Sequence, residues 1–302
     1  MTNILFSCAR NEGPFLLEWT VFHRLIGFDR IILFTNDNTD GSDDLLKVLN
    51  DRGLIEHHTH SPTEAPQLAA AQTAMQAGMF SEGDWVMWLD LDEFLNIHIG
   101  DGKLDDLTQR FDHAGGVALN WRTFGSSGHQ TWPGRQIAPD FCMASARQFF
   151  VNAQVKTLFR YGPHIESLYV HRPTFNSLEF LEGIGPFIGG DGSPVAEEFY
   201  LGKRRSGTPI QKTLAKRRFF KIAQVNHYAV RTPDMYERRK ARGLGDRYKG
   251  DTTVRHDDEY FARNDRNNFE DTSILRYLPR LNVELEKLIQ DPEIASALSK
   301  IT

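Results

Sequence analysis

The sequence has few cysteines, no long apolar run and no strong net charge, and each lack excludes a class of protein. Its two cysteines, Cys8 and Cys142, lie far apart without metal-ligand spacing, which predicts buried thiols in a reducing compartment. No segment approaches the ~20 apolar residues that span a bilayer, and the apolar start is interrupted too early for a signal peptide. The formal charge of −5 indicates no nucleic-acid partner. We therefore expect a soluble, cytoplasmic protein.

The chain is long enough to bury a large core. It has 302 residues, 40% of them hydrophobic, which suits one large domain or one domain with a subdomain. Neither an internal repeat nor a low-complexity segment interrupts it.

The first 125 residues alternate strand and helix patterns. Apolar runs predict strands at 4–9, 30–35, 55–60, 85–91 and 116–121. Helices are expected from Pro14, with an inward stripe of Phe15, Trp19, Phe22 and Ile26, after Ser42, at 67–80 and at 104–111. This alternation is typical of an α/β fold with a mainly parallel sheet covered by helices on both faces.

After residue 125 the pattern becomes irregular. Glycine-rich loops occur at 124–129 and 183–194, and the stretch 201–221 carries eight Lys or Arg without an acidic residue. A strand is expected at 219–230, a basic helix at 233–242 and an amphipathic C-terminal helix at 274–288. The basic stretch 203–221 is either a solvated face or a surface for a diphosphate or an anionic membrane.

Polar loops follow three of the predicted strands, at 8–14, 36–42 and 89–95. Ligands of parallel sheets bind beyond the carboxyl ends of the strands, so these three loops are candidates for the ligand-binding site. The third loop contains Asp90, Asp92 and Glu93. On an extended strand Asp90 and Asp92 would share one face and Glu93 would point elsewhere. Two such carboxylates suit Mg²⁺ or Mn²⁺, although a solvated strand end has the same pattern.

The other candidates have ordinary structural explanations as well. Arg10, Asn11 and Glu12 either hold a diphosphate or cap a helix, and Asp37 either binds a ribose or base or serves turn chemistry. His227 is either a ligand or a satisfied structural histidine, and the same holds for His129, His164 and His171. Lys156 and Arg160 form a pair that can reach phosphate or an acidic sugar.

Four segments together resemble a known family. They are CARNEGPFLLEW (8–19), HRLIGFDRIILFTNDNTDGS (23–42), WLDLDEFL (88–95) and NHYAVRT (226–232). They are similar to the family 2-like glycosyltransferases and, more closely, to a bacterial subgroup related to the family 92 (DUF23) enzymes. The resemblance implies a GT-A fold, in which a Rossmann-like nucleotide-sugar part at 1–125 merges with an acceptor-side region and C-terminal helices at 126–302.

The resemblance also implies roles for individual residues. Asp90 and Asp92 would form the D-x-D pair that holds Mn²⁺ or Mg²⁺, with His227 completing the metal site. The nucleotide sugar, a UDP- or GDP-sugar, would be bound by Arg10, Asn11, Glu12, Asp37, Gln67, Asp90, Trp121, Gly125, Lys156, Arg231 and Lys240. The metal and basic residues would stabilise the leaving diphosphate. The late acidic pair that supplies the base in typical family 2 enzymes is lacking, and Glu166 and Asp191 are the candidates.

The implied activity is transfer of a sugar to a glycan or glycolipid acceptor, in surface-polysaccharide or lipopolysaccharide assembly, with peripheral contact to the inner face of the membrane through basic segments. Two alternatives stay open. A sugar-phosphate nucleotidyltransferase uses a similar sheet, but its G-x-G-x-R type of first loop differs from SCARNEG. A non-catalytic glycan-binding protein on the same fold is the other.

Overall fold

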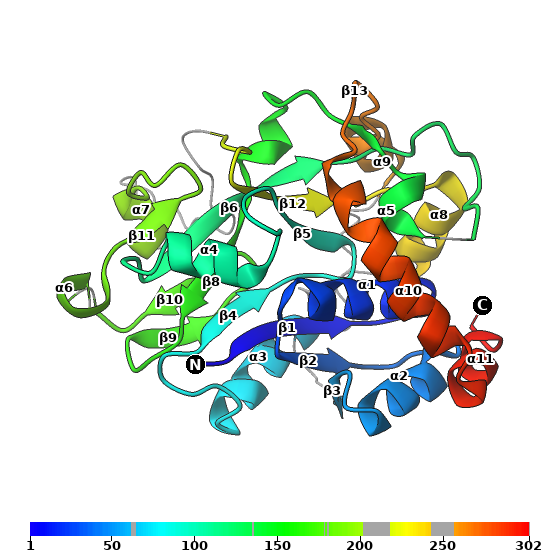
Figure 1. Cartoon of the computed structure of the whole chain (residues 1–302), viewed down its shortest axis with the longest axis horizontal. Helices are drawn as coiled ribbons and strands as arrows, with labels where there is room; N and C mark the ends of the chain where they lie inside the picture. Colours follow the sequence, from blue (N-terminus) through cyan, green and yellow to red (C-terminus); the bar gives the residue numbers. More distant parts are fainter. Residues whose placement is uncertain are drawn as a thin grey trace.

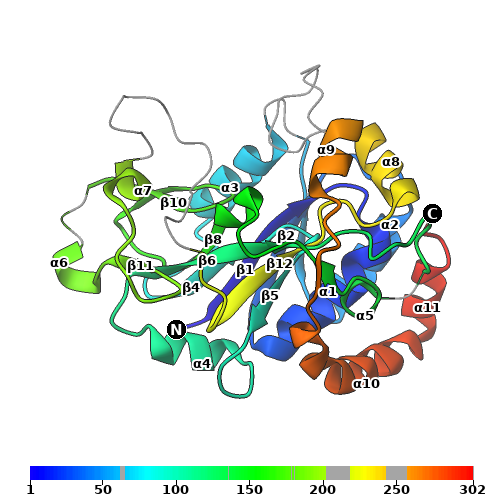
Figure 2. The same cartoon turned by 90° about the horizontal axis from the view of Figure 1, so that it is seen from above.

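A single large sheet organises the protein (Figure 1). The computed structural model describes residues 1–61, 65–134, 136–177, 179, 181–201, 218–242 and 257–301. Within these residues the sheet has nine strands in the order β3-β2-β1-β4-β8-β6-β12-β5, and β11 pairs with β6 outside this path. Helices cover both of its faces, as Figure 2 shows from above.

The first half of the sheet is parallel. It contains β1 (Asn3–Ala9), β2 (Arg30–Thr35), β3 (Glu56–Thr59) and β4 (Trp85–Trp88). Alternate residues of β1 enter two hydrophobic clusters: Leu5 packs on the side of α1 and α2, whereas Ile4 and Phe6 pack on the side of α3. These helices are α1 (Gly13–Ile26), α2 (Ser42–Asp51) and α3 (Pro66–Gln76). Burial on both faces explains why the strands are continuous apolar runs.

The second half of the sheet is mixed. Strand β8 (Val155–Arg160) lies antiparallel between β4 and β6 (Gly116–Thr123). Strand β12 (Ala223–His227) runs parallel to β6, and β5 (Glu93–Ile97) pairs antiparallel with β12 at the edge. Strand β11 (Phe187–Gly189) pairs parallel with the start of β6. The sheet is thus mainly parallel and flanked by helices, which confirms the expected fold class.

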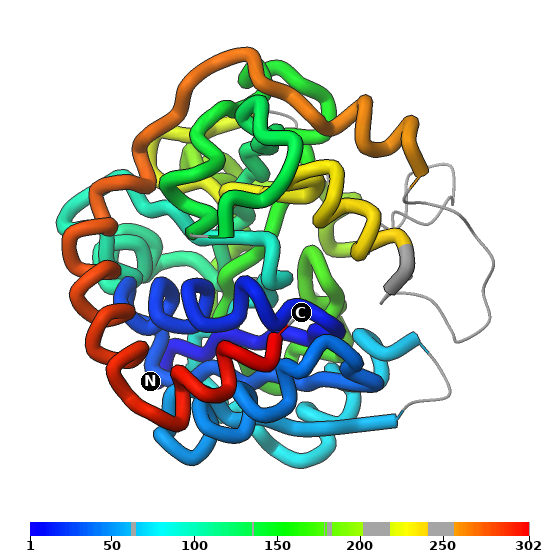
Figure 3. Tube along the Cα trace, turned by 90° about the vertical axis from the view of Figure 1, so that its right-hand side faces the viewer, coloured from blue at the N-terminus to red at the C-terminus, as the bar shows by residue number. Residues whose placement is uncertain are grey.

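The C-terminal helices return to the N-terminal half of the chain. Helix α10 (Leu278–Ile289) packs against α1, and α11 (Pro292–Leu298) packs against α2, as the red and blue segments of Figure 3 show. The other elements are α4 (Leu104–Arg110), α5 (Ile137–Asp140), β7 (Met143–Ala144), η1 (Phe150–Ala153), β9 (Ile165–Leu168), β10 (Pro173–Phe175), α6 (Leu181–Ile184), α7 (Glu197–Leu201), α8 (Pro233–Arg242), α9 (Asp258–Asn264), β13 (Phe269–Glu270) and η2 (Ser273–Tyr277).

One expected strand is wrong in a way that matters for the site. The segment 85–91 is not a continuous strand, because β4 ends at Trp88 and a turn leads into β5 at Glu93. The backbone of Glu93 donates to the carbonyl of Asp90 at 3.0 Å, which closes the turn. The indole Nε1 of Trp19 donates to the carbonyls of Asp90 and Glu93 at 3.1 and 3.0 Å. The acidic motif therefore lies on a turn fastened to α1.

Two further boundaries differ from expectation. The late strand covers only Ala223–His227 of the expected 219–230, and the expected helix at 274–288 begins as the 3₁₀ turn η2. No helix in the described part of the chain is long and apolar enough to cross a membrane.

Candidate active site

A buried cluster of charges surrounds the turn between β4 and β5. Lys156 on β8 is fully buried, and its ammonium lies 3.2 Å from Asp90 and 2.8 Å from Glu93. The carboxylate of Glu93 also accepts from the backbone of Asp90 at 2.8 Å. The expectation that Glu93 points away from the pair is therefore wrong, because on a turn the three acids do not alternate between faces as they would on a strand.

Burial and opposite charges act differently on these acids. Burial raises the pKa of Asp90 and raises that of Glu93 to about 8, although the charge of Lys156 opposes both shifts. For Lys156, burial lowers the pKa, but the two carboxylates outweigh it and the net shift is upward. The cluster therefore holds its lysine charged and favours a proton on Glu93.

Asp92 faces a second set of partners. It is 3% exposed, its Oδ2 lies 3.7 Å from Nε2 of His227, and it accepts a hydrogen bond from the guanidinium of Arg239. Burial alone would raise the pKa of Asp92, yet the charges of Arg239, His227 and Arg231 hold it well below its ordinary value. Asp92 is thus ionised under all ordinary conditions.

Aromatic rings extend the site from Asp92 toward β8. Trp121 on β6 lies against the ring of His227, with centroids 3.9 Å apart, and the ring centroid of His171 lies 5.2 Å from that of Trp121. Nδ1 of His171 contacts the carbonyl of Val155 at 2.9 Å, next to Lys156. From the sequence His171 is either a ligand or a structural histidine, and in the fold it contacts Trp121.

A pocket of about 410 Å³ lies beside this cluster. Its lining includes Arg10, Asn11 and Glu12 from the first loop together with Arg231. Arg231 is buried, lies 3.2 Å from Glu12 and places its guanidinium 3.6 Å from the centre of the Phe15 ring. Segments 219 positions apart in the chain therefore share one wall.

Backbone strain gathers in the same loops. Only four described residues other than glycine have a positive φ, namely Asn11 at 52°, Asp37 at 48°, Ser127 at 53° and Arg231 at 50°. Left-handed backbone is costly for most L-residues and persists where the surroundings impose it, often at functional sites. Hydrogen bonds between the first and second loops hold Asn11 in this conformation. The backbone N–H of Asn11 donates to the side-chain oxygen of Asn38 at 3.0 Å, and the backbone N–H of Thr39 donates to the side-chain oxygen of Asn11 at 2.8 Å.

The remaining predicted residues are placed as follows. Gln67, at the start of α3, donates to Asp90 at 3.3 Å and so joins the acid cluster. Gly125 permits close packing of the loop 124–129, because an added Cβ would lie 2.5 Å from Oδ1 of Asn267. Lys240 bonds Glu237 and Asp258 at the surface, at 2.8 Å each.

The two candidate bases lie in different surroundings. Glu166 is exposed on β9, which belongs to a separate two-stranded sheet with β10. Asp191 accepts from the backbone and hydroxyl of Ser193 at 3.0 and 2.5 Å, which is a local turn pattern. Neither arrangement identifies the base.

Arg239 is a site residue that sequence reasoning missed. It lies four residues after the buried Met235 on α8, so both occupy one helix face. The four-residue spacing from Met235 could have indicated that Arg239 faces inward. However, basic residues at 238–242 flank Arg239, so the sequence does not distinguish it from these neighbours.

The chemistry of Asp90, Asp92 and His227 suits a divalent cation. Carboxylate oxygens bind both Mg²⁺ and Mn²⁺, and an imidazole binds Mn²⁺. In the arrangement described, however, Asp90 binds Lys156 and Asp92 binds Arg239. Among the described residues, no group of three or more His, Cys, Asp or Glu side chains is arranged to hold a metal ion. A cation at Asp92 and His227 therefore requires Arg239 to move.

Comparison with known proteins identifies the family. The model of glycosyltransferase family 92 matches residues 10–173, which include the D-x-D turn, Trp121 and Lys156. A family 92 protein of Ricinus communis is 29% identical over 132 residues, which are 42% of this chain and 24% of that protein. One of Oryza sativa subsp. japonica is 26% identical over 136 residues, 44% of this chain and 23% of that protein. The chain thus covers about a quarter of the length of these relatives.

Solved structures are more distant. TarS of S. aureus superposes with a TM-score of 0.32 at 14% identity, covering 53% of this chain and 28% of that one. A 1–349 form of the same protein in complex with UDP-GlcNAc has the same TM-score and identity and covers 53% of this chain and 45% of that one. Because the family model accounts for more than half of the 302 residues, the chain belongs to glycosyltransferase family 92.

Proposed function

We propose that this protein transfers a sugar from a nucleoside-diphosphate sugar to a glycan or glycolipid acceptor. The observation that carries the proposal is the convergence of distant segments on one place: the 410 Å³ pocket joins the first loop to Arg231, and Arg239 joins that pocket to Asp92 and His227. Membership of family 92 supports the same reaction class.

The donor diphosphate fits the arginine-rich side of the pocket. Arg238 and Arg239 line it from α8, Arg231 lines it from the connection between β12 and α8, and Arg10 lines it from the first loop. Arginine is the side chain best suited to the oxygens of a diphosphate, because its guanidinium donates several parallel hydrogen bonds. The charge of these arginines would stabilise the negative charge that develops on the leaving nucleoside diphosphate.

The cofactor is proposed to be Mn²⁺ or Mg²⁺, held by Asp92 and His227 with Asp90 close by. When bound, the ion would supply Lewis-acid stabilisation of the diphosphate. Without the ion, Arg239, His227 and Arg231 keep Asp92 ionised, and Lys156 and Gln67 hold Asp90. When the ion is bound, Arg239 would leave Asp92 and bind the donor phosphates instead.

A carboxylate must take the proton of the acceptor hydroxyl if the reaction inverts the sugar. Asp191 and Glu166 are proposed for this role. Both are accessible to solvent in part, so either can reach an acceptor that enters from outside. Replacing each by its amide and measuring transfer against donor hydrolysis tests the assignment: a true base variant loses transfer and keeps donor binding.

Calorimetry with UDP and GDP, each with Mn²⁺ and with EDTA, tests donor and cofactor. We expect metal-dependent binding that Asp92→Asn weakens at least about tenfold, since a hydrogen bond to a charged group contributes about 1.5–3 kcal/mol. Asp44→Asn, at an exposed acid paired with Lys300, is the matched control and leaves binding unchanged. Equal binding in EDTA contradicts the metal assignment alone, whereas no binding of any nucleotide contradicts the donor site.

Reaction products separate the alternatives. A glycosyltransferase incubated with nucleotide sugar releases nucleoside diphosphate, and a nucleotidyltransferase instead makes nucleotide sugar and pyrophosphate. A glycan-binding protein does neither.

The setting is proposed to be surface-polysaccharide or lipopolysaccharide assembly in the cytoplasm, with peripheral membrane contact through basic segments. Most of 203–221 lies outside the described residues. Failure to float with anionic vesicles contradicts the membrane contact.

A further inference from the structure

A second, larger pocket of about 670 Å³ lies away from the site described above. Arg122 on β6 and Gln224 on β12 line it, together with His98, Arg147, Phe220 and Asp271. Successive side chains of a strand point to opposite faces. Arg122 and Gln224 therefore occupy the face opposite Trp121 and His227, and the two pockets share no lining residue.

The pocket carries positive charge that the described residues only partly neutralise. Arg122 is 4% exposed, donates to the carbonyl of Ser145 at 2.5 Å and lies 3.4 Å from Asp271. Arg147 is exposed and has no ion pair with any described residue. Both guanidinium groups lie over the ring of Phe220, at 5.7 and 6.0 Å from its centre. Burial lowers the pKa of Arg122, and the charge of Arg147 lowers it further.

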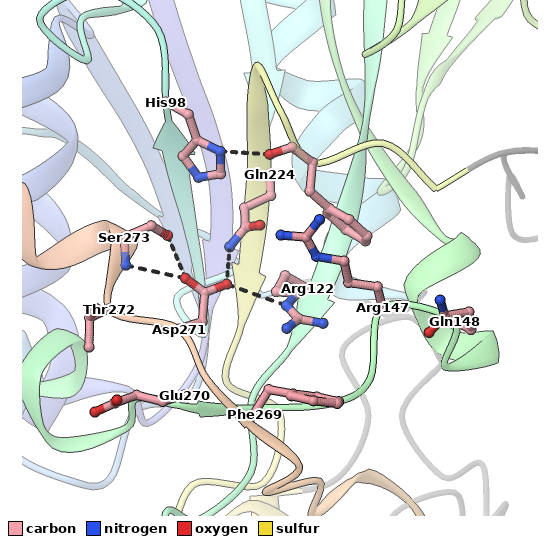
Figure 4. Close-up of a pocket in the computed structure, with 11 residues that line it drawn as sticks. His98, Arg122, Arg147, Gln148, Gln224, Phe269, Glu270, Asp271, Thr272 and Ser273 are labelled. Atoms are coloured by element: carbon pink, nitrogen blue, oxygen red, sulfur yellow. Dashed lines mark hydrogen bonds and ion pairs between the residues drawn. The ribbon is translucent and has the colours of Figure 1, made fainter.

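Asp271 is the only described carboxylate paired with either arginine, and it is already shared. It accepts from Gln224 at 3.1 Å and from the hydroxyl of Ser273 at 2.5 Å in addition to its contact with Arg122. Glu270 also lines the pocket, but Figure 4 shows its side chain pointing away from the two arginines. Among the described residues, one guanidinium charge is therefore left without a counter-ion in this concave site.

The same pocket offers groups that bind sugar hydroxyls. Nδ1 of His98 contacts the carbonyl of Phe220 at 2.7 Å and must donate to it, so Nε2 is an acceptor. That Nε2 is buried and has no hydrogen-bond partner among the described residues. Phe269, 58% exposed, places an aromatic ring at the rim. A free acceptor, a free cation and an aromatic rim together suit a polar ring that carries a negative group.

We propose that this pocket binds an anionic saccharide, a hexose bearing a carboxylate or a phosphate, at a site separate from the nucleotide-sugar site. Arg147 binds the anionic group, with Arg122 behind it, His98 accepts from a hydroxyl, and Phe269 packs against the ring. The choice of a saccharide rests on the proposed glycosyltransferase function, and such a site would hold an acidic residue of the acceptor glycan.

Ligand-observed NMR and calorimetry on the full chain test the inference. The probes are glucuronate, galacturonate, glucose 6-phosphate, neutral glucose and inorganic phosphate. We expect one of the acidic sugars to bind better than glucose and phosphate, and we expect Arg147→Gln to weaken it about tenfold, the size of one lost charged hydrogen bond. Arg147 is exposed, so this variant folds. A carboxylate or a phosphate preference tells the two sources of the anion apart.

Arg263→Gln is the matched control, because Arg263 also lies over an aromatic ring, that of Tyr260, but does not line the pocket. It leaves saccharide binding unchanged, and so does Asp92→Asn. Binding of phosphate as tight as that of every acidic sugar, equal binding of glucose, no saccharide binding, or full affinity in Arg147→Gln would each overturn the inference. Nucleotide binding measured on the same samples shows separately whether the donor site exists.

Discussion

Lys156→Met tests whether the buried lysine neutralises the acidic turn or binds the donor. The ammonium is fully buried, 3.2 Å from Asp90 and 2.8 Å from Glu93, and Glu93 is itself fully buried. Removing one partner of a buried ion pair leaves an uncompensated charge, which typically costs about 3–5 kcal/mol of unfolding free energy. We expect the lower end of that range, because Glu93 can take up a proton. Even this is a large share of a typical stability of about 5–15 kcal/mol.

The loss has a defined pH dependence. Burial raises the pKa of Glu93 in the folded protein to about 8, above its ordinary value of 4.5, and removing the charge of Lys156 raises it further. The folded state keeps a proton that the unfolded state releases, so the unfolding free energy of both proteins falls as pH rises from 4.5. In the wild type this fall ends near pH 8, whereas in the variant it continues to higher pH, so the difference between them grows above pH 8. Adding Glu93→Gln removes this titration, and the double variant should lose the pH-dependent part.

Urea unfolding followed by tryptophan fluorescence, at pH 7 and at pH 9, measures both effects. Lys47→Met is the matched control, because Lys47 pairs with Asp51 at the surface, where solvent screens an ion pair and it contributes little to stability. A loss below about 1 kcal/mol for Lys156→Met, accompanied by loss of nucleotide binding, would refute the structural role and return Lys156 to the donor site.

Two further predictions concern the packing that holds the site. Burial lowers the pKa of His23 to about 3 in the folded state, below its ordinary 6.5, so the unfolded state alone binds a proton between these values. Stability is then complete above pH 6.5 and falls by about 1.4 kcal/mol per unit below it. His23→Gln should show a shallower decline between pH 6.5 and 5 in urea titrations; parallel curves contradict this. Gly41→Ala places a Cβ 2.3 Å from the carbonyl oxygen of Lys300 at a position with a φ of 80°. Gly53→Ala is the control, because its φ is similar at 67° but its added Cβ would have no atom within 4 Å. Thermal and urea unfolding should therefore show a larger loss of stability for Gly41→Ala than for Gly53→Ala. Equal losses would mean that the C-terminal segment yields to the new methyl group.

The local parts of the fold could be predicted because their causes are local. Arg30–Thr35 and Pro233–Arg242 have the boundaries expected from the sequence, since an uninterrupted apolar run and a Pro-initiated basic helix each stand alone. The prediction of a strand over 85–91 was wrong, because a buried turn stabilised by the indole of Trp19 has the same apolar sequence pattern as a buried strand. Its hydrogen-bond partner lies about 70 positions away, which no local pattern contains.

The sequence by itself determined that three polar loops lie at one edge of an α/β sheet and that the third carries Asp90 and Asp92. Tertiary structure alone decided what these acids contact. Lys156 reaches them only because β8 inserts antiparallel beside β4, and Arg239 reaches Asp92 only because α8 folds back over the edge. Charges buried together must be balanced, and the balance depends on distances of a few ångströms between side chains far apart in the chain. Composition and periodicity describe neighbours along the chain, so they cannot supply those distances.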